Sequence, residues 1–392
     1  MFALSLPRRK FLKTAATAGA IALLAACGPM PGGQAGPAFD SSKPVPVALL
    51  VPSGSGNSGD EALATALQQA AQMAIADVAG GVKIDLRVYS SGADPALAAQ
   101  MATRAADEGA AIILGPVFGD SALAAGQAVA GRGINVLAFS NNSDVAGGNV
   151  FILGQTAQNS ARRLVGYAAR QGKGAILIAH EKTPQGDLGK RAIMAAASGT
   201  GAKIVGTVPY DFNGPGVTSA VPAIVATAKS TGASTLMLTA DSAGALPLLA
   251  QLLPEQGLGP TAIQYAGLTR WDIPQATLSL PALQGGWFTL PDPGLSAQFQ
   301  SRYAAAYGQS PHPIAGLAYD GIAAVAALVK SGRPNPFSSS SLTQAAGFAG
   351  VNGVFRLLPD GTNQRGLAVA QIQNGQPVVI DPAPRSFGGL GL

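Results

Sequence analysis

Apolar residues form short continuous runs that alternate with longer stretches of helical spacing, beginning at residue 45. Residues 45–51 are almost continuously apolar, which is typical of a parallel strand buried on both faces. The next segment begins at Asp60, carries apolar residues on one helical face and ends at Gly80-Gly81. The same alternation predicts strands at 83–89, 111–114 and 134–139 and helices after Pro95 and from about Asp120. Such a series favours a parallel sheet with helices on both faces.

A second series of the same kind begins near Phe151. It predicts strands at 175–179, 203–208, 235–239 and 262–266 and helices at 184–197 and 217–229. The two series show no obvious sequence repeat, so their similarity is architectural. A chain of 392 residues is also longer than one ordinary core requires. We therefore expect an α/β protein with two Rossmann-like lobes.

The C-terminal part does not follow this alternation of strands and helices. Two predicted helices, 295–307 and 314–329, follow one another without a strand between them. A Pro/Ser-rich stretch then leads to two antiparallel strand segments, 354–358 and 367–380. The second segment contains an Asn374-Gly375 hairpin turn. Late chain crossings of this kind indicate a hinge between the lobes. We predict lobe one at 44–154 plus 288–337, lobe two at 155–287 plus 338–382, and a tail at 383–392.

The N-terminus predicts export. A basic stretch that includes Arg8-Arg9 precedes an uncharged run, 14–26, which is shorter than the roughly 20 residues that span a bilayer. Residues 1–26 therefore indicate a signal peptide, and Arg8-Arg9 resembles a twin-arginine signal. Leu24-Ala25-Ala26-Cys27 resembles a bacterial lipobox, which implies lipidation of Cys27. Residues 27–43 would then be the lipidated cysteine and a flexible tether, holding the protein in the periplasm on a bacterial membrane.

Composition excludes several classes of site. Cys27 is the only cysteine and there are two histidines, so neither a thiolate cluster nor a three-histidine zinc site is expected. The net charge of +5 falls mostly on residues 1–26, which hold four Lys or Arg and no acid. We therefore expect no metal, no cofactor and no nucleic-acid partner.

Polar residues at predicted strand-to-helix junctions are the candidate ligand-binding residues. Ligands of open parallel sheets bind beyond the carboxyl ends of the strands, where helix N-termini favour anions. The candidates are Ser53, Pro116, Ser121, Ser140 and Asn141 in lobe one and His180, Asp241, Thr269 and Trp271 in lobe two.

Residues 45–380 resemble the type I periplasmic binding proteins of the Leu/Ile/Val-binding kind. The resemblance is carried by residues 47–54, 112–116, 174–181 with Gly186, and Phe299, Tyr303, Tyr307-Gly308, Pro311 and 318–320, in that order and spacing. It implies two lobes that close on a ligand like a clamp, no catalytic residues, and capture of a small polar, amino-acid-like solute for an ABC importer.

Two positions depart from the amino-acid binders. The lobe-two loop at 268–271 lacks the acid that these proteins present to a ligand ammonium, and Gln185 replaces a common aromatic residue. The stretches 269–272 and 282–288 instead resemble the penicillin-binding protein activators, non-enzymatic lipoproteins that regulate peptidoglycan synthesis. The partner is therefore either the permease of an ABC transporter or a peptidoglycan synthase.

The sequence patterns that would indicate an enzyme are weaker. Residues 54–59 match the G-x-G-x-x-G dinucleotide fingerprint, which leaves an exported NAD(P)-dependent oxidoreductase as a remote alternative, although the next strand ends without the acid that binds a ribose. His180 adjoins Glu181, but neighbours on a strand point to opposite faces. No G-x-S-x-G nucleophile elbow occurs.

Overall fold

The computed structural model describes residues 43–78 and 81–387. The predicted signal peptide, Cys27 and nearly all of the predicted tether lie outside these described residues. In the part that is described, no helix is long and apolar enough to cross a lipid bilayer.

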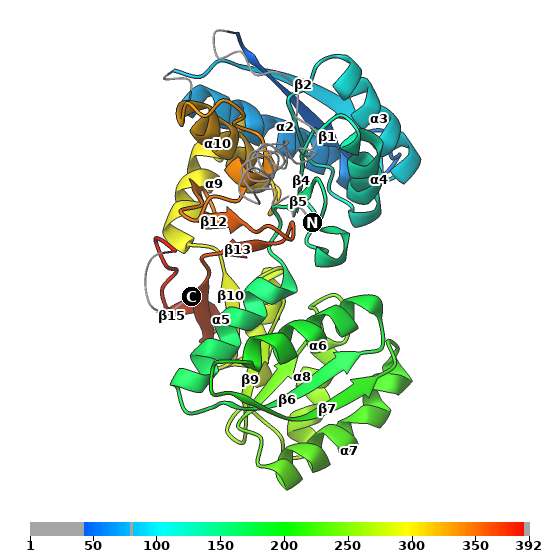
Figure 1. Cartoon of the computed structure of the whole chain (residues 1–392). Helices are drawn as coiled ribbons and strands as arrows, with labels where there is room; N and C mark the ends of the chain where they lie inside the picture. Colours follow the sequence, from blue (N-terminus) through cyan, green and yellow to red (C-terminus); the bar gives the residue numbers. More distant parts are fainter. Residues whose placement is uncertain (1–42, 79–80, 388–392) are drawn as a thin grey trace, which may run out of the picture. The chain divides into compact units, whose positions relative to one another are not determined.

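The first lobe is built on a parallel sheet with strand order β2-β1-β3-β4-β5. Its strands are β1 (Val45–Val51), β2 (Ile84–Ser90), β3 (Ile112–Leu114), β4 (Val136–Ala138) and β5 (Val150–Ile152). The connections contain α2 (Ser58–Val78), α3 (Pro95–Asp107), α4 (Gly119–Ala130) and the 3-10 turn η1 (Ser143–Val145). α10 (Gly316–Lys330) returns from late in the chain to pack beside α2 (Figure 1).

The continuous apolar run of β1 is explained by its central place in this sheet. Successive side chains of a strand point to opposite faces. Val47 and Leu49 accordingly enter the core formed with α2 and α10, while Ala48 and Leu50 enter the core formed with α3 and α4. Because both faces are covered by helices, no polar position is tolerated along the strand.

The second lobe carries a mixed sheet with strand order β15-β14-β10-β9-β8-β6-β7. Its strands are β6 (Ala175–Glu181), β7 (Lys203–Tyr210), β8 (Thr235–Leu238), β9 (Gln264–Gly267), β10 (Trp287–Leu290), β14 (Ala368–Gln373) and β15 (Gln376–Asp381). Its helices are α5 (Ala157–Arg170), α6 (Pro184–Ala197), α7 (Gly214–Thr231) and α8 (Leu246–Glu255), with the 3-10 turns η2 (Gln275–Ser279) and η3 (Pro281–Leu283). The strands from β7 to β10 are parallel, and β14 and β15 add to them antiparallel.

A small antiparallel sheet lies between α10 and the second lobe. It comprises β11 (Phe348–Gly350), β12 (Gly353–Leu357) and β13 (Asn363–Arg365), and it follows α9 (Pro293–Tyr307), α10 and α11 (Ser339–Leu342). Phe348, Phe355 and Leu357 belong to the core of the first lobe. The chain passes between the lobes after β5, after β10 and after β13 (Figure 1).

The predicted lobe boundaries need correction in two places. Residues 348–357 pack in the core of lobe one, although the sequence division placed 338–382 in lobe two. Strand β10 lies in the sheet of lobe two, although the division placed 288–337 in lobe one. Both errors concern strands whose pairing is set by distant parts of the chain.

The predicted α/β alternation is confirmed, with strand and helix bounds that differ by a few residues. Asn374 and Gly375 have φ of 52° and 71°, as a two-residue primed turn requires, and they connect β14 to β15. Helix α8 was not predicted. Its buried residues, Leu246, Leu249, Ala250 and Leu253, have helical spacing, but the apolar residues between them, with Pro247 and Pro254, obscure this spacing in the sequence.

Candidate functional site

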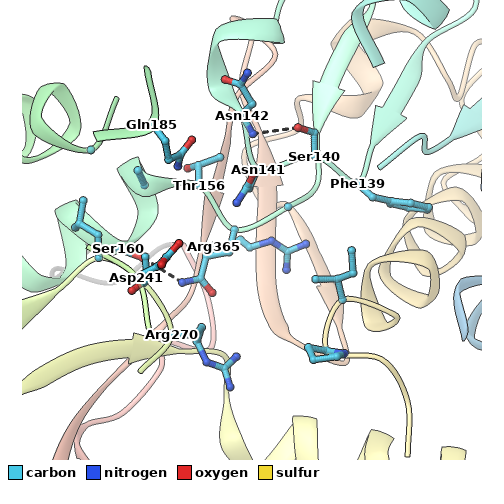
Figure 2. A pocket seen from close by; sticks show the side chains of 18 of the residues that line it. Phe139, Ser140, Asn141, Asn142, Thr156, Ser160, Gln185, Asp241, Arg270 and Arg365 are labelled. Atoms are coloured by element: carbon cyan, nitrogen blue, oxygen red, sulfur yellow. Dashed lines mark hydrogen bonds between the residues drawn. The ribbon is translucent and has the colours of Figure 1, made fainter. Parts of the chain in front are cut away.

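A cavity of about 600 Å³ lies where loops of the two lobes face each other. Its walls come from the carboxyl ends of the parallel strands, as expected for an open α/β sheet. Figure 2 shows Ser140, Asn141 and Asn142 from lobe one, and Gln185 and Asp241 from lobe two, around this space.

The lobe-one wall is formed by the loop after β4 and by the start of α4. The Ser140 hydroxyl accepts a hydrogen bond from the Asn142 amide at 3.1 Å, which fixes the turn of the loop. Gly154 lies against this loop, because a Cβ there would be 2.3 Å from the Ser140 carbonyl oxygen. Phe118 provides no side-chain cap for α4, so the free N–H groups of its first turn begin beside the cavity.

The lobe-two wall carries two carboxylates. Glu181 ends β6 and is buried, and its Oε2 accepts hydrogen bonds from Thr239 Oγ1 at 2.6 Å and from the Tyr210 hydroxyl at 3.0 Å. Burial, together with the neighbouring Glu181 carboxylate, raises the pKa of Tyr210, so this phenol stays a neutral donor. Asp241 follows β8 and is exposed at the cavity. Neither Glu181 nor Asp241 forms an ion pair with another described residue.

Arg365 lies at the junction of the lobes. Its Nε donates to the Leu153 carbonyl at 2.7 Å, and its Nη1 pairs with Asp320 at 3.1 Å. Both side chains of this ion pair are buried, and the guanidinium lies over the Phe355 ring. Nη2 is also buried and has no hydrogen-bond partner within the described chain. Arg365 lines the cavity, so the cavity wall includes a buried cation with one unpaired guanidinium nitrogen.

The periplasmic binding protein family model matches residues 44–377. The chain belongs to the periplasmic binding protein family. This match confirms the type I resemblance drawn from the sequence, and solved structures confirm the two-lobed α/β fold. A comparison with curated protein sequences gives no match.

Three solved structures illustrate the fold similarity. A protein from Rhodospirillum rubrum, described as a branched-chain amino acid ABC transporter, has a TM-score of 0.73 at 17% identity, covering 86% of this chain and 100% of its own. A substrate-binding protein of an ABC transporter from Desulfitobacterium hafniense, in complex with leucine, has a TM-score of 0.65 at 17% identity, covering 86% and 100%. A solute-binding protein from R. palustris, in complex with benzoate, has a TM-score of 0.60 at 18% identity, covering 89% and 99%.

Four of the residues predicted for the ligand site of this periplasmic binding protein line the cavity. These are Ser140 and Asn141 from lobe one and Asp241 and Thr269 from lobe two. All four directly follow a strand or lie within three residues of its end. The ends of the predicted strands therefore mark both walls of the cavity.

Four other predicted residues lie outside the cavity lining, three of them at strand ends and Ser121 within α4. Ser53 donates to the Ser90 hydroxyl at 2.7 Å, and Ser121 is fully buried within α4. Pro116 is buried, and its carbonyl accepts from the Phe139 amide. His180 is buried with Nδ1 3.3 Å from the Glu181 carbonyl, and burial lowers its pKa, so the ring is neutral at pH 7.

Trp271 was also predicted as a ligand contact, and this prediction is wrong. The side chain is fully buried in the core of lobe two and packs near Phe288. The indole fits only because residues 267 and 286 are glycines. A Cβ on Gly267 would be 2.2 Å from the indole, and a Cβ on Gly286 would be 2.7 Å from it. The Gly and Trp pattern in this region is therefore explained by packing.

Three further residues of the cavity wall are not among the predicted site residues: Glu181, Arg365 and Arg270. Glu181 is next to His180 on a strand, and adjacent strand residues point to opposite faces. One of the two side chains can therefore face the cavity, and it is Glu181. Arg365 had no local signal, since its partner Asp320 lies 45 positions away. Arg270 also lines the cavity and pairs with Asp272 two residues later.

The Gly54–Gly59 loop does not fit a dinucleotide. The Gly54 amide donates to Glu61 Oε1 at 2.6 Å, and the Ser55 hydroxyl donates to Asp60 at 2.8 Å. Two carboxylates thus accept hydrogen bonds from the loop that would have to receive a pyrophosphate, and their negative charges would repel it. Across residues 43–78 and 81–387, no group of three His, Cys, Asp or Glu side chains could hold a metal ion.

Proposed function

We propose that this protein is a lipid-anchored periplasmic solute receptor that captures a small amino-acid-like ligand between its lobes for an ABC importer. The observation that carries the proposal is the chemical asymmetry of the cavity. Lobe one contributes hydroxyl, amide and helix N-terminal N–H groups, and lobe two contributes the carboxylates Glu181 and Asp241. An open cavity of about 600 Å³ is within the range of small-molecule sites, roughly 300–1,000 Å³.

Glu181 and Asp241 are suited to a ligand ammonium. The two cations that line the cavity are already paired within the protein, Arg270 with Asp272 and Arg365 with Asp320. The Glu181 and Asp241 carboxylates lack such a cation. A bound ammonium would supply it, and Thr239 and Tyr210 already hold the Glu181 side chain in one position. The acid missing at 268–271 would thus be provided by these two residues.

The start of α4 and the loop at Ser140–Asn142 are suited to a ligand carboxylate. Free N–H groups at a helix N-terminus favour an anion, and α4 begins beside the cavity without a side-chain cap. Phe139, Ile314 and Leu317 also line the cavity and offer apolar surface to the rest of the solute. The related proteins bound to leucine and to benzoate support a small carboxylate as the ligand class.

The membrane anchor and the importer rest on the sequence and on the relatives. Leu24-Ala25-Ala26-Cys27 supports lipidation of Cys27, and several structural relatives are described as parts of ABC transporters. Regulation of peptidoglycan synthesis is less well supported. A protein-binding activator does not need a hollow cleft lined by polar groups, and the Gly and Trp pattern that favoured it is explained by core packing.

Thermal unfolding of the purified full chain against a ligand panel tests this function. The panel contains zwitterionic amino acids, the matching carboxylic acids without the amino group, and the matching amines without the carboxylate. A ligand at one hundred times its Kd stabilises the folded state by about 2.7 kcal/mol. We expect this stabilisation only for a zwitterion, and its absence throughout the panel would exclude the amino-acid-like ligand class.

A further inference from the structure

A second cavity, of about 200 Å³, lies at the junction between α5 and β13 and is rich in arginine. Arg162, Arg163 and Arg170 of α5 and Arg365 of β13 all line it, together with Gly166 and Gln364. Arg365 is shared with the cleft described above. The other arginines are not part of that cleft.

The helical spacing of α5 creates this cavity. Arg162, Gly166 and Arg170 are four residues apart and therefore share one face of the helix. Gly166 has no side chain, and a Cβ there would be 3.6 Å from Arg170 Nη1, so the Arg170 guanidinium lies against the glycine. Arg162 and Arg170, one helical turn before and after Gly166, both line the cavity with it.

The positive charge of the cavity is only partly neutralised. Asp381 pairs with both Arg163 and Arg170, at 2.9 and 2.7 Å, and Asp320 pairs with Arg365. The Arg162 side chain has no ion pair or hydrogen bond with any described residue. Arg162 is exposed to solvent, and the nearby Arg356 adds a second positive charge beside it.

Arg163 and Arg170 have different roles in this cluster. Arg163 also donates to the main-chain carbonyls of Leu367 and Pro382, so it is largely committed to holding the C-terminal segment. Arg170 is half exposed and is held only by Asp381 in addition to its position over the Tyr167 ring. Arg162 and Arg170 are therefore the two guanidiniums available to an incoming group.

We propose that this cavity binds a phosphate group. Guanidinium forks match phosphate oxygens with paired hydrogen bonds, and the shortage of counter-charge favours an anion over a neutral solute. The volume lies below the usual range for larger organic ligands, about 300–1,000 Å³, and suits a compact group. Since α5 belongs to lobe two and β13 pairs with β12, which packs in the core of lobe one, a phosphate here contacts both lobes at the point where the chain crosses between them.

Isothermal titration of the purified full chain, at constant ionic strength, tests the proposal. One arm uses inorganic pyrophosphate, and a second uses short-chain phosphatidylglycerol below its micelle concentration, so that the arms separate a soluble phosphate from a lipid headgroup. We expect one of the two probes to bind, and Arg162→Gln and Arg170→Gln each to weaken it by about tenfold or more. Arg162→Lys should retain part of the affinity, because it keeps the charge and loses the fork.

Arg132→Gln is the matched control, since Arg132 is an exposed arginine of lobe one paired only with Asp107. It should leave the affinity unchanged, and the far-UV circular dichroism of all variants should match that of the wild type. The proposal is overturned if neither probe binds, or if the Arg162 and Arg170 variants bind as tightly as the control. The thermal panel for the cleft is independent of these outcomes.

Discussion

Arg191 of the second lobe forms an ion pair with Asp144 of the first lobe, with 3.0 Å between Nη2 and Oδ2. Asp144 lies in η1, directly after the loop that carries Ser140, and Arg191 lies on α6, whose first turn carries Gln185. Ser140 and Gln185 both line the cleft. The pair therefore connects the two walls of the proposed ligand site from outside it.

Removing this inter-lobe pair is expected to have a small effect that depends on salt. Both side chains are exposed, and exposed pairs contribute about 0.2–1 kcal/mol. A double-mutant cycle with Asp144→Asn and Arg191→Gln, followed by denaturant unfolding, should give a coupling in this range at low salt and none at about 1 M salt, where the Debye length is roughly 3 Å. A coupling that is independent of salt would contradict an exposed electrostatic contact.

The buried Asp320–Arg365 pair is expected to matter far more for stability. Asp320 is fully buried, and besides Arg365 it accepts the Val351 amide at 2.8 Å, so it joins α10 to the small sheet. Removing one partner of such a pair leaves an uncompensated charge and costs about 3–5 kcal/mol. Denaturant unfolding of Arg365→Met should show this loss, whereas Asp107→Asn, at an exposed pair, should cost about 1 kcal/mol or less. Equal losses in the two variants would contradict the assignment.

Gly267 is expected to tolerate no side chain. A Cβ at this position would be 2.2 Å from the Trp271 indole, which is enclosed by the core and cannot move aside without displacing its neighbours. Overpacking of this kind costs about 1–3 kcal/mol. Gly267→Ala should therefore lower the free energy of unfolding by at least this amount, while Gly214→Ala, where a Cβ meets no atom within 4 Å, should be nearly neutral. A neutral Gly267→Ala would show that Trp271 is loosely packed.

Asp77 is expected to make stability depend on pH in the acid range. Burial opposes ionisation of this carboxyl, but hydrogen bonds from Arg302, at 2.6 Å, and Tyr319, at 2.7 Å, outweigh burial and lower its pKa below the ordinary value of 3.8. A lowered pKa in the folded state stabilises the protein above the unfolded pKa, and this contribution is lost as the pH falls through the folded value. Unfolding free energies of wild type and Asp77→Asn should thus differ at pH 6, begin to converge near the unfolded pKa of about 3.9, and converge fully only below the lower folded pKa. A difference that persists unchanged at pH 2 would contradict the ionic origin.

The fold could be predicted from the sequence because its signals are local. The apolar run of β1 and the apolar face of α2 can each be recognised within one continuous segment of the sequence. Asn374-Gly375 likewise specifies a hairpin turn by itself. The membership of β10 and β12 in their sheets could not be predicted in this way, because pairing partners far along the chain decide it.

The same distinction applies to the cleft. Ser140, Asn141, Asp241 and Thr269 were found because each lies close to the end of a recognisable strand. The Glu181 side chain is held by Tyr210 and Thr239, and the Arg365 side chain is held by Asp320. Only the tertiary structure brings these partners together. Trp271 was misplaced because an aromatic residue in a loop after a strand has the same local sequence whether it faces a ligand or fills the space above two glycines.

Isothermal titration of the best panel amino acid into the full chain tests whether the cleft binds a zwitterion through Glu181. We predict one site per chain in the wild type and an affinity at least about tenfold weaker in Glu181→Gln, because a hydrogen bond to a charged group contributes roughly 1.5–3 kcal/mol. Asp85→Asn, an acid on β2 that pairs with Arg87 away from the cleft, should bind like the wild type. Equal affinity in wild type and Glu181→Gln would exclude Glu181 as the ammonium ligand, and no binding by the wild type would exclude a zwitterion site in the cleft.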